Sequence, residues 1–178
     1  QRERPTERHR AKGREGTTTP HTTQRPATTG GHAAVVAGTG AKLIAHQGAA
    51  GLIPGGDRGV KAGDVIKVGR TVELECLDTP GHTMCHICLR AHGDEPALFS
   101  GDTLFNAGAG NCHNGGNVTS LYASFAEQIA KLPDATRVYA GQDYMEHNLR
   151  FPPDREPDNE TSRRGRPPPQ GHDPATGP

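Results

Sequence analysis

Residues 79–83 read TPGHT, residues 100–105 read SGDTLF, and residues 138–144 read VYAGQDY. Each phrase has the pattern of a strand that runs into a turn containing glycine, and the first two turns carry His82 and Asp102, which are potential metal ligands. Because these two residues are about twenty positions apart, they meet only if their strands lie side by side and end at the same edge of a sheet. The sequence therefore predicts a common site at one sheet edge.

In this order, the three phrases resemble the second half of the metallo-β-lactamase fold. Their wording is most similar to that of the hydroxyacylglutathione hydrolases (glyoxalase II), and the resemblance covers roughly residues 30–159. It implies an α+β fold, namely a partial αββα sandwich built from the second half of the family fold.

The resemblance also implies the chemistry. Family members hold two metal ions, zinc here by expectation, which acidify a bound water molecule and polarise a thioester carbonyl. His82 matches a ligand of the first metal, and Asp102 matches the carboxylate that bridges both. Tyr144 matches a tyrosine that helps to hold glutathione. The expected substrate is a small-molecule thioester such as an S-acylglutathione, and metal-bound water replaces any side-chain nucleophile.

Two departures from the family pattern stand out. The last metal ligand of the family is the histidine of a Gly-His-Glu-Tyr phrase, and this chain has Gln142 at that position. A glutamine offers a neutral oxygen in place of an imidazole, so it is a poor zinc ligand. Residues 22–29 read TTQRPATT where the family has its T-H-x-H-x-D-H signature. The strands expected before that signature are missing too, so we expect an impaired enzyme with an uncovered sheet edge.

A shifted reading frame accounts for the second departure. The codons GGC GAC CAC for Gly-Asp-His, read one base out of frame, encode Ala-Thr-Thr, which stands at residues 27–29. The composition of segment 163–169, RRGRPPP, is also what GC-rich DNA would encode when it is translated in a wrong frame. We expect re-sequencing of the locus to recover the family signature, and an intact upstream frame with the present codons would refute this interpretation.

Composition divides the chain into three parts. Residues 1–32 contain seven basic and three acidic residues but only two alanines as hydrophobic residues, and residues 153–178 contain seven prolines. Neither end buries enough apolar surface to offset the entropy of ordering, so both are expected to be disordered. Residues 33–152 are the expected metallo-β-lactamase-like domain, which is long enough for one core.

The charge and cysteine content bear on partners and compartment. No aromatic residues are interleaved with the arginines of the basic arm, so we expect a solvated tail that binds neither nucleic acid nor membrane. The N-terminus has no apolar signal segment, and four cysteines in such a chain predict reduced thiols and a cytoplasmic location. Cys85 and Cys88 have CxxC spacing, but the segment 83–89 reads as a strand, which would point them to opposite faces.

The remaining pattern predicts the secondary structure. Helices are expected at 33–38, 47–53, 118–132 and 143–151, and strands at 41–46, 64–68, 71–77, 83–90, 96–100 and 136–140. The Gly- and Asn-rich residues 106–117 are expected to form an irregular loop.

Three functional hypotheses remain open at this point. The first is a thioester hydrolase of the glyoxalase II type. The second is a catalytically inactive remnant that binds a partner. The third is a small zinc-binding module formed by Cys85, Cys88, Cys112 and His113.

Overall fold

The computed structural model describes residues 18–23, 31–53 and 56–148. Its elements follow one another along the chain as a few strands and helices, then a run of strands, then the longest helix and a last strand. In order they are β1 Thr18–Pro20, α3 His32–Thr39, β2 Lys42–His46, α4 Gln47–Ala50, β3 Gly56–Val60, β4 Val65–Val68, β5 Val72–Asp78, β6 Ile87–Ala91, β7 Ala97–Gly101, β8 Leu104–Phe105, β9 Gly108–Ala109, α5 Val118–Glu127, a 3-10 turn η1 Ile129–Lys131, β10 Arg137–Ala140 and α6 Met145–Asn148.

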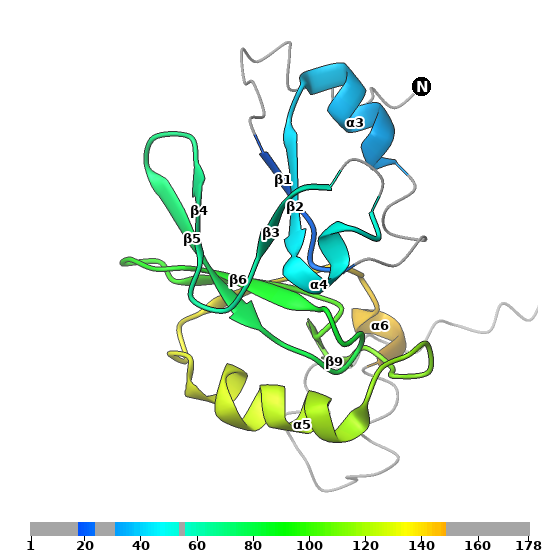
Figure 1. Ribbon diagram of the computed structural model, residues 1–178. Helices are drawn as coiled ribbons and strands as arrows, with labels where there is room; N and C mark the ends of the chain where they lie inside the picture. Colours follow the sequence, from blue (N-terminus) through cyan, green and yellow to red (C-terminus); the bar gives the residue numbers. More distant parts are fainter. Residues whose placement is uncertain (1–17, 24–30, 54–55, 149–178) are drawn as a thin grey trace, which may run out of the picture.

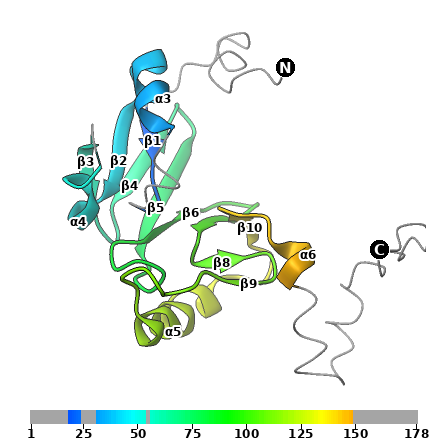
Figure 2. The same cartoon turned by 90° about the vertical axis from the view of Figure 1, so that its right-hand side faces the viewer.

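Two larger sheets organise these elements (Figure 1). A parallel three-stranded sheet has the order β1-β2-β3, and a five-stranded sheet has the order β10-β7-β6-β5-β4. Neighbours in the larger sheet are antiparallel except β10 and β7, which run parallel. Helix α5 lies on the side of the larger sheet opposite the small sheet, and Figure 2 shows the same arrangement from the side.

The main core lies between the two sheets. Ile44 and Val60 of the small sheet pack with side chains of the large sheet, and the main cluster is completed by Ile66, Leu74, Cys76, Ile87 and Leu89. Leu74 and Cys76 alternate along β5 with more exposed residues, which is the period of two that a sheet with one buried face requires. Apolar burial between the sheets therefore fixes the register of the strands that carry the site.

Several expected elements are present. The segments 64–68 and 71–77 form the β4–β5 hairpin, with Val68 paired to Val72 across the Gly69-Arg70 turn. Helix α3 ends at Gly40, whose φ of 67° is the left-handed conformation that a helix C-terminus favours. The fold is α+β, as the sequence predicted, with mixed sheets and few helices.

Three expectations about local structure are wrong. Residues 18–20, inside the arm expected to be disordered, form β1, whose register pairs Thr19 with Leu43 of β2. The segment 106–117 is not wholly irregular, because Gly108–Ala109 pairs with Leu104–Phe105 as a small hairpin. Strand β6 starts at Ile87 and not at residue 83, because residues 83–86 close the turn that carries His82. Residues 1–17 and 149–178, with most of the expected tails, lie outside the described residues.

One apolar surface of the five-stranded sheet remains uncovered within the described structure. A groove of about 380 Å³ opens there between β1 and the sheet, and Leu74, Leu89, Phe99 and Tyr139 are among its lining residues. The rings of Phe99 and Tyr139 stack at 5.1 Å, yet the two residues stay 39% and 49% exposed. Exposed apolar surface of this kind favours association and loose packing.

We expect this surface to bind the dye 8-anilinonaphthalene-1-sulfonate (ANS) and to cause self-association at micromolar concentration, with a broad thermal transition. Tyr139→Lys should lower dye fluorescence and association, because it places a charge in the groove. Tyr122→Lys, at an exposed tyrosine on α5 outside the groove, is the matched control. Fluorescence titration and sedimentation velocity make the measurement. A sharp, cooperative melt of monomeric protein without dye binding would contradict the expectation.

Candidate functional site

His82 and Asp102 meet at the edge of the five-stranded sheet. His82 lies in the turn between β5 and β6, and Asp102 follows β7 directly. His82 Nε2 is 3.4 Å from Asp102 Oδ2, and the two residues are only 3% and 6% exposed. The expected convergence of these two residues is therefore confirmed, while their role as metal ligands stays a prediction.

The turn carrying His82 rests directly on α5. Gly81 has a φ of 152°, and a Cβ atom at this position would overlap the backbone of Leu121. The backbone N–H of Asn117, the N-cap of the helix, donates to the Gly81 carbonyl at 2.8 Å. Glycine is required here because only a residue without a side chain permits this close approach.

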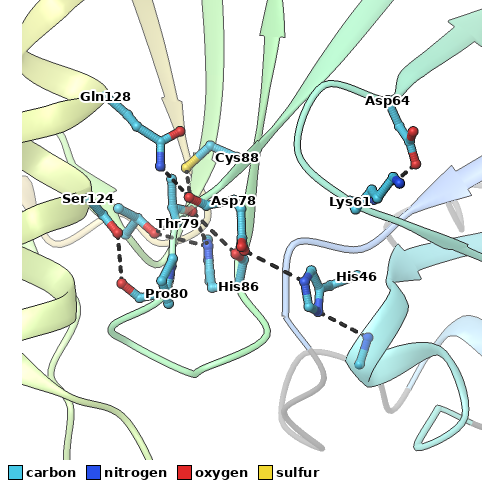
Figure 3. Close-up of polar contacts among 12 residues, drawn as sticks. His46, Lys61, Asp64, Asp78, Thr79, Pro80, His86, Cys88, Ser124 and Gln128 are labelled. Carbon is cyan, nitrogen blue, oxygen red and sulfur yellow. Dashed lines mark hydrogen bonds and ion pairs between the residues drawn. The ribbon is translucent and has the colours of Figure 1, made fainter.

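Two polar side chains of α5 and its C-cap hold the same turn (Figure 3). Ser124 Oγ donates to the Pro80 carbonyl at 2.8 Å, and the Gln128 amide donates to the Asp78 carbonyl. Together with Asn117 and Leu121, these residues recur at intervals of four, three and four, so they share one helix face. The sequence analysis missed them because it considered only the apolar positions of this helix, and the signal was the polar residues at the same spacing.

The orientation of the His82 ring follows from its partners. His82 Nδ1 is 2.6 Å from the carbonyl oxygen of Asn111, which only accepts hydrogen bonds, so Nδ1 carries the proton. Nε2 consequently faces Asp102 with its lone pair when the ring is neutral. Gly110 donates its N–H to the Asp102 carbonyl at 3.0 Å, and a side chain there would strike the His82 ring. The loop before α5 thus closes over both residues.

A second histidine, His86, lies wholly buried beside the pair. Its ring centroid is 6.2 Å from that of His82, with the planes nearly perpendicular. Burial, and secondarily the neighbouring His82, lowers the pKa of His86 to about 3. His86 is therefore a neutral hydrogen-bonding group in the folded protein. The sequence analysis gave it no role, although it follows His82 by four residues in a segment that also contains Cys85 and Cys88.

The other two expected site residues lie at the exposed end of the site. The Gly141 N–H donates to the Gly101 carbonyl at 2.8 Å, which places the backbone before Gln142 beside Asp102. Gln142 itself is exposed. Tyr144 is 48% exposed and packs edge-on against Phe105 at 5.4 Å between ring centroids. Its role in substrate binding stays a prediction.

The donors in the described residues do not fit a catalytic zinc site. Such a site typically uses three protein ligands, and His82 and Asp102 supply two. Within residues 18–23, 31–53 and 56–148, no group of three or more His, Cys, Asp or Glu side chains could hold a metal ion. Residues 24–30 lie outside the described structure, and their sequence, QRPATTG, offers no imidazole or carboxylate. Thr22 instead lies against Gly101, next to Asp102.

The cysteines do not form the alternative zinc module. Cys88 lies in β6 with its thiol 3.3 Å from Thr79 Oγ1, and burial raises its pKa to about 11. Burial also raises the pKa of Cys85, which precedes the strand. The absence of a three-ligand group in the described residues, which include Cys112 and His113, argues against this module.

Comparison with known proteins identifies the family. A model of the metallo-β-lactamase superfamily matches residues 5–142, more than half of the chain. The chain belongs to the metallo-β-lactamase superfamily. Its fold agrees, because the crystal structure of the B3 metallo-β-lactamase BLEG-1 superimposes with a TM-score of 0.68 at 20% identity, covering 81% of this chain and 83% of that one.

Two curated relatives within the superfamily carry the same name. The chain is 72% identical over 147 residues to a hydroxyacylglutathione hydrolase of Polaromonas sp., covering 83% of this chain and 56% of the relative. It is 60% identical over 132 residues to one of Nitrosococcus oceani, covering 74% and 50%. The crystal structure of ETHE1 from Myxococcus xanthus matches with a TM-score of 0.54 at 29% identity, covering 74% of this chain and 52% of that one. The chain thus spans about half the length of these curated relatives.

Membership of this superfamily implies metal binding. Among the helices of residues 18–23, 31–53 and 56–148, none has the length and apolar character needed to cross a membrane.

The low pKa of His86 makes stability depend on pH. The unfolded chain binds a proton at His86 near pH 6.5, whereas the folded chain stays neutral there until about pH 3. Stability from this group is therefore complete above pH 6.5 and falls by about 1.4 kcal/mol per pH unit below it. Urea unfolding of wild type and His86→Gln from pH 7.5 to 5, with a chelator present, measures the difference. Parallel pH profiles for the two proteins would contradict the expectation.

Proposed function

We propose that this protein is a metal-dependent thioester hydrolase of the hydroxyacylglutathione hydrolase type, acting on small-molecule thioesters such as S-acylglutathiones. The observation that carries the proposal is the buried approach of His82 to Asp102, on the TPGHT and SGDTLF phrases, at the edge of a metallo-β-lactamase sheet. The hydroxyacylglutathione hydrolases of Polaromonas sp. and Nitrosococcus oceani support the substrate class.

The chain's own residues have distinct tasks in this proposal. Asn111 holds the Nδ1 proton of His82 through its carbonyl and leaves the Nε2 lone pair directed toward Asp102. The Asp102 carboxylate supplies the negative charge of the site. Tyr144, half exposed beside Phe105, offers a ring and a hydroxyl to the thiol portion of the substrate.

Zinc is the proposed metal, but the part of the chain that the structure describes provides too few donors to hold it in the usual way. His82 and Asp102 are the two matched ligands, and the neutral, exposed Gln142 adds only a weak third. We therefore propose that the activity is impaired. The four cysteines, free of disulfides, support a reducing compartment and hence a cytoplasmic location.

The uncovered groove favours a second candidate function. Its apolar lining, with Phe99 and Tyr139 stacked and exposed, suits a catalytically inactive remnant that binds a partner through the sheet face. This alternative also rests on the small number of metal ligands. Metal analysis of the purified protein distinguishes it from a working hydrolase, because the inactive remnant would hold no metal.

We expect the chain to hydrolyse S-lactoylglutathione more than about a hundredfold more slowly than the full-length Polaromonas relative, because water that is not bound to a metal keeps a pKa far above neutrality. Gln142→His alone should recover little activity, and Gln47→His on α4 is the control for an added histidine. Replacing residues 23–29 with the family's T-H-x-H-x-D-H signature together with Gln142→His should restore zinc binding before turnover. Zinc-supplemented assays with metal analysis make the measurement. Robust, chelator-sensitive turnover by the unchanged chain would show that the ligands have been undercounted.

A further inference from the structure

His86 is a buried histidine whose hydrogen bonds all lead to the two turns that carry the site. It follows His82 by four residues and precedes β6, and none of its surface is exposed. Its ring contacts the backbone of Asp102 and not the Asp102 carboxylate. Figure 3 shows its ring close to Thr79, which opens the turn that carries His82.

The partners of the ring define its tautomer. The backbone N–H of Asp102 donates to His86 Nε2 at 3.2 Å, so Nε2 carries no proton. In a neutral ring the proton is then on Nδ1, which lies 2.9 Å from Thr103 Oγ1 and 3.1 Å from Thr79 Oγ1. Both ring nitrogens are therefore satisfied, as a buried polar side chain requires.

These contacts join two turns that are distant in sequence. Thr79 opens the turn that carries His82, and its N–H donates to the His86 carbonyl at 3.0 Å. Thr103 follows Asp102, and its hydroxyl donates to that of Thr79 at 3.3 Å. The ring thus holds the Asp102 backbone on one side and the threonines of both turns on the other.

We infer that His86 is a positioning residue that sets the separation between His82 and Asp102. The inference rests on the proposed function for the use of that pair, but the positioning itself is measured without turnover. A histidine that merely filled the core would bond wherever a partner was available. Here each nitrogen bonds to a turn that carries a site residue, and no other residue connects Asp102 N–H to the turn of His82 in the described structure.

Two substitutions test the hydrogen bonds of the two ring nitrogens of His86 separately. The amide oxygen of glutamine in His86→Gln lies about as far from Cβ as Nε2 does, so it accepts the Asp102 N–H. The shorter side chain of His86→Asn reaches the threonines at the Nδ1 position and leaves the Asp102 N–H without an acceptor. His92→Gln and His92→Asn, at an exposed histidine after β6, are the matched controls.

The first readout is hydrogen exchange of the Asp102 amide by NMR, relative to amides within β5. We expect about a tenfold faster relative exchange in His86→Asn, little change in His86→Gln, and none in the His92 controls. The inference is overturned if the Asp102 amide in His86→Asn exchanges as in wild type. It is also overturned if both His86 variants accelerate Asp102 and β5 amides equally, because that result describes a general loosening of the core.

The second readout is the affinity for zinc(II) chloride alone, measured by competition with a chromophoric chelator on the same variants made in the chain that carries the T-H-x-H-x-D-H signature and Gln142→His. We expect His86→Asn to bind about tenfold more weakly than His86→Gln, because an Asp102 that is not fixed opposite His82 meets the metal less often in the correct geometry. Equal affinities of these two variants would count against positioning. If no protein in the series binds zinc while the exchange rates still separate as expected, the proposed function fails and the positioning role of His86 stands.

Discussion

The site depends on the hydrogen bonds between α5 and the turn before β6. Carbonyl groups at the end of a strand have no ladder partner, and in this protein Asn117, Ser124 and Gln128 supply donors to three of them. The glycine at position 81 permits the helix backbone to come close enough for these bonds to form. His82 therefore projects from a turn with little freedom, and it lies at the same sheet edge as Asp102 because the start of β6 is beside the end of the antiparallel β7.

Burial determines the protonation state of the side chains behind the site. Burial keeps His86 neutral and the Cys88 thiol protonated, because either charged form would lose its hydration without gaining an opposite charge. The neutral groups serve as hydrogen-bonding links between backbone segments. Asp102 and His82 are then the ionisable pair that the buried edge of the sheet presents for chemistry.

The incomplete ligand set and the uncovered groove lie at the same place in the fold. Thr22 contacts Gly101 next to Asp102, and the groove that includes Thr22 extends from there along the apolar face to Phe99 and Tyr139. In the family, the segment at this position supplies metal ligands and follows strands that pack on this face. The segment around Thr22 therefore lies next to both the candidate site and the apolar face of the sheet.

The sequence by itself determined the family, through the resemblance carried by TPGHT and SGDTLF, and it also predicted the β4–β5 hairpin and the meeting of His82 with Asp102. These features depend on local turn chemistry and on alternation along strands, which are visible in a single sequence. It was wrong about β1, because Thr18–Pro20 has no apolar pattern and forms a strand only by pairing with buried β2. It also missed His86, Ser124 and Gln128, because their importance depends on partners up to fifty residues away. Only the tertiary structure decided those contacts, since a polar residue acquires a role in a site when folding brings a specific unpaired backbone group against it.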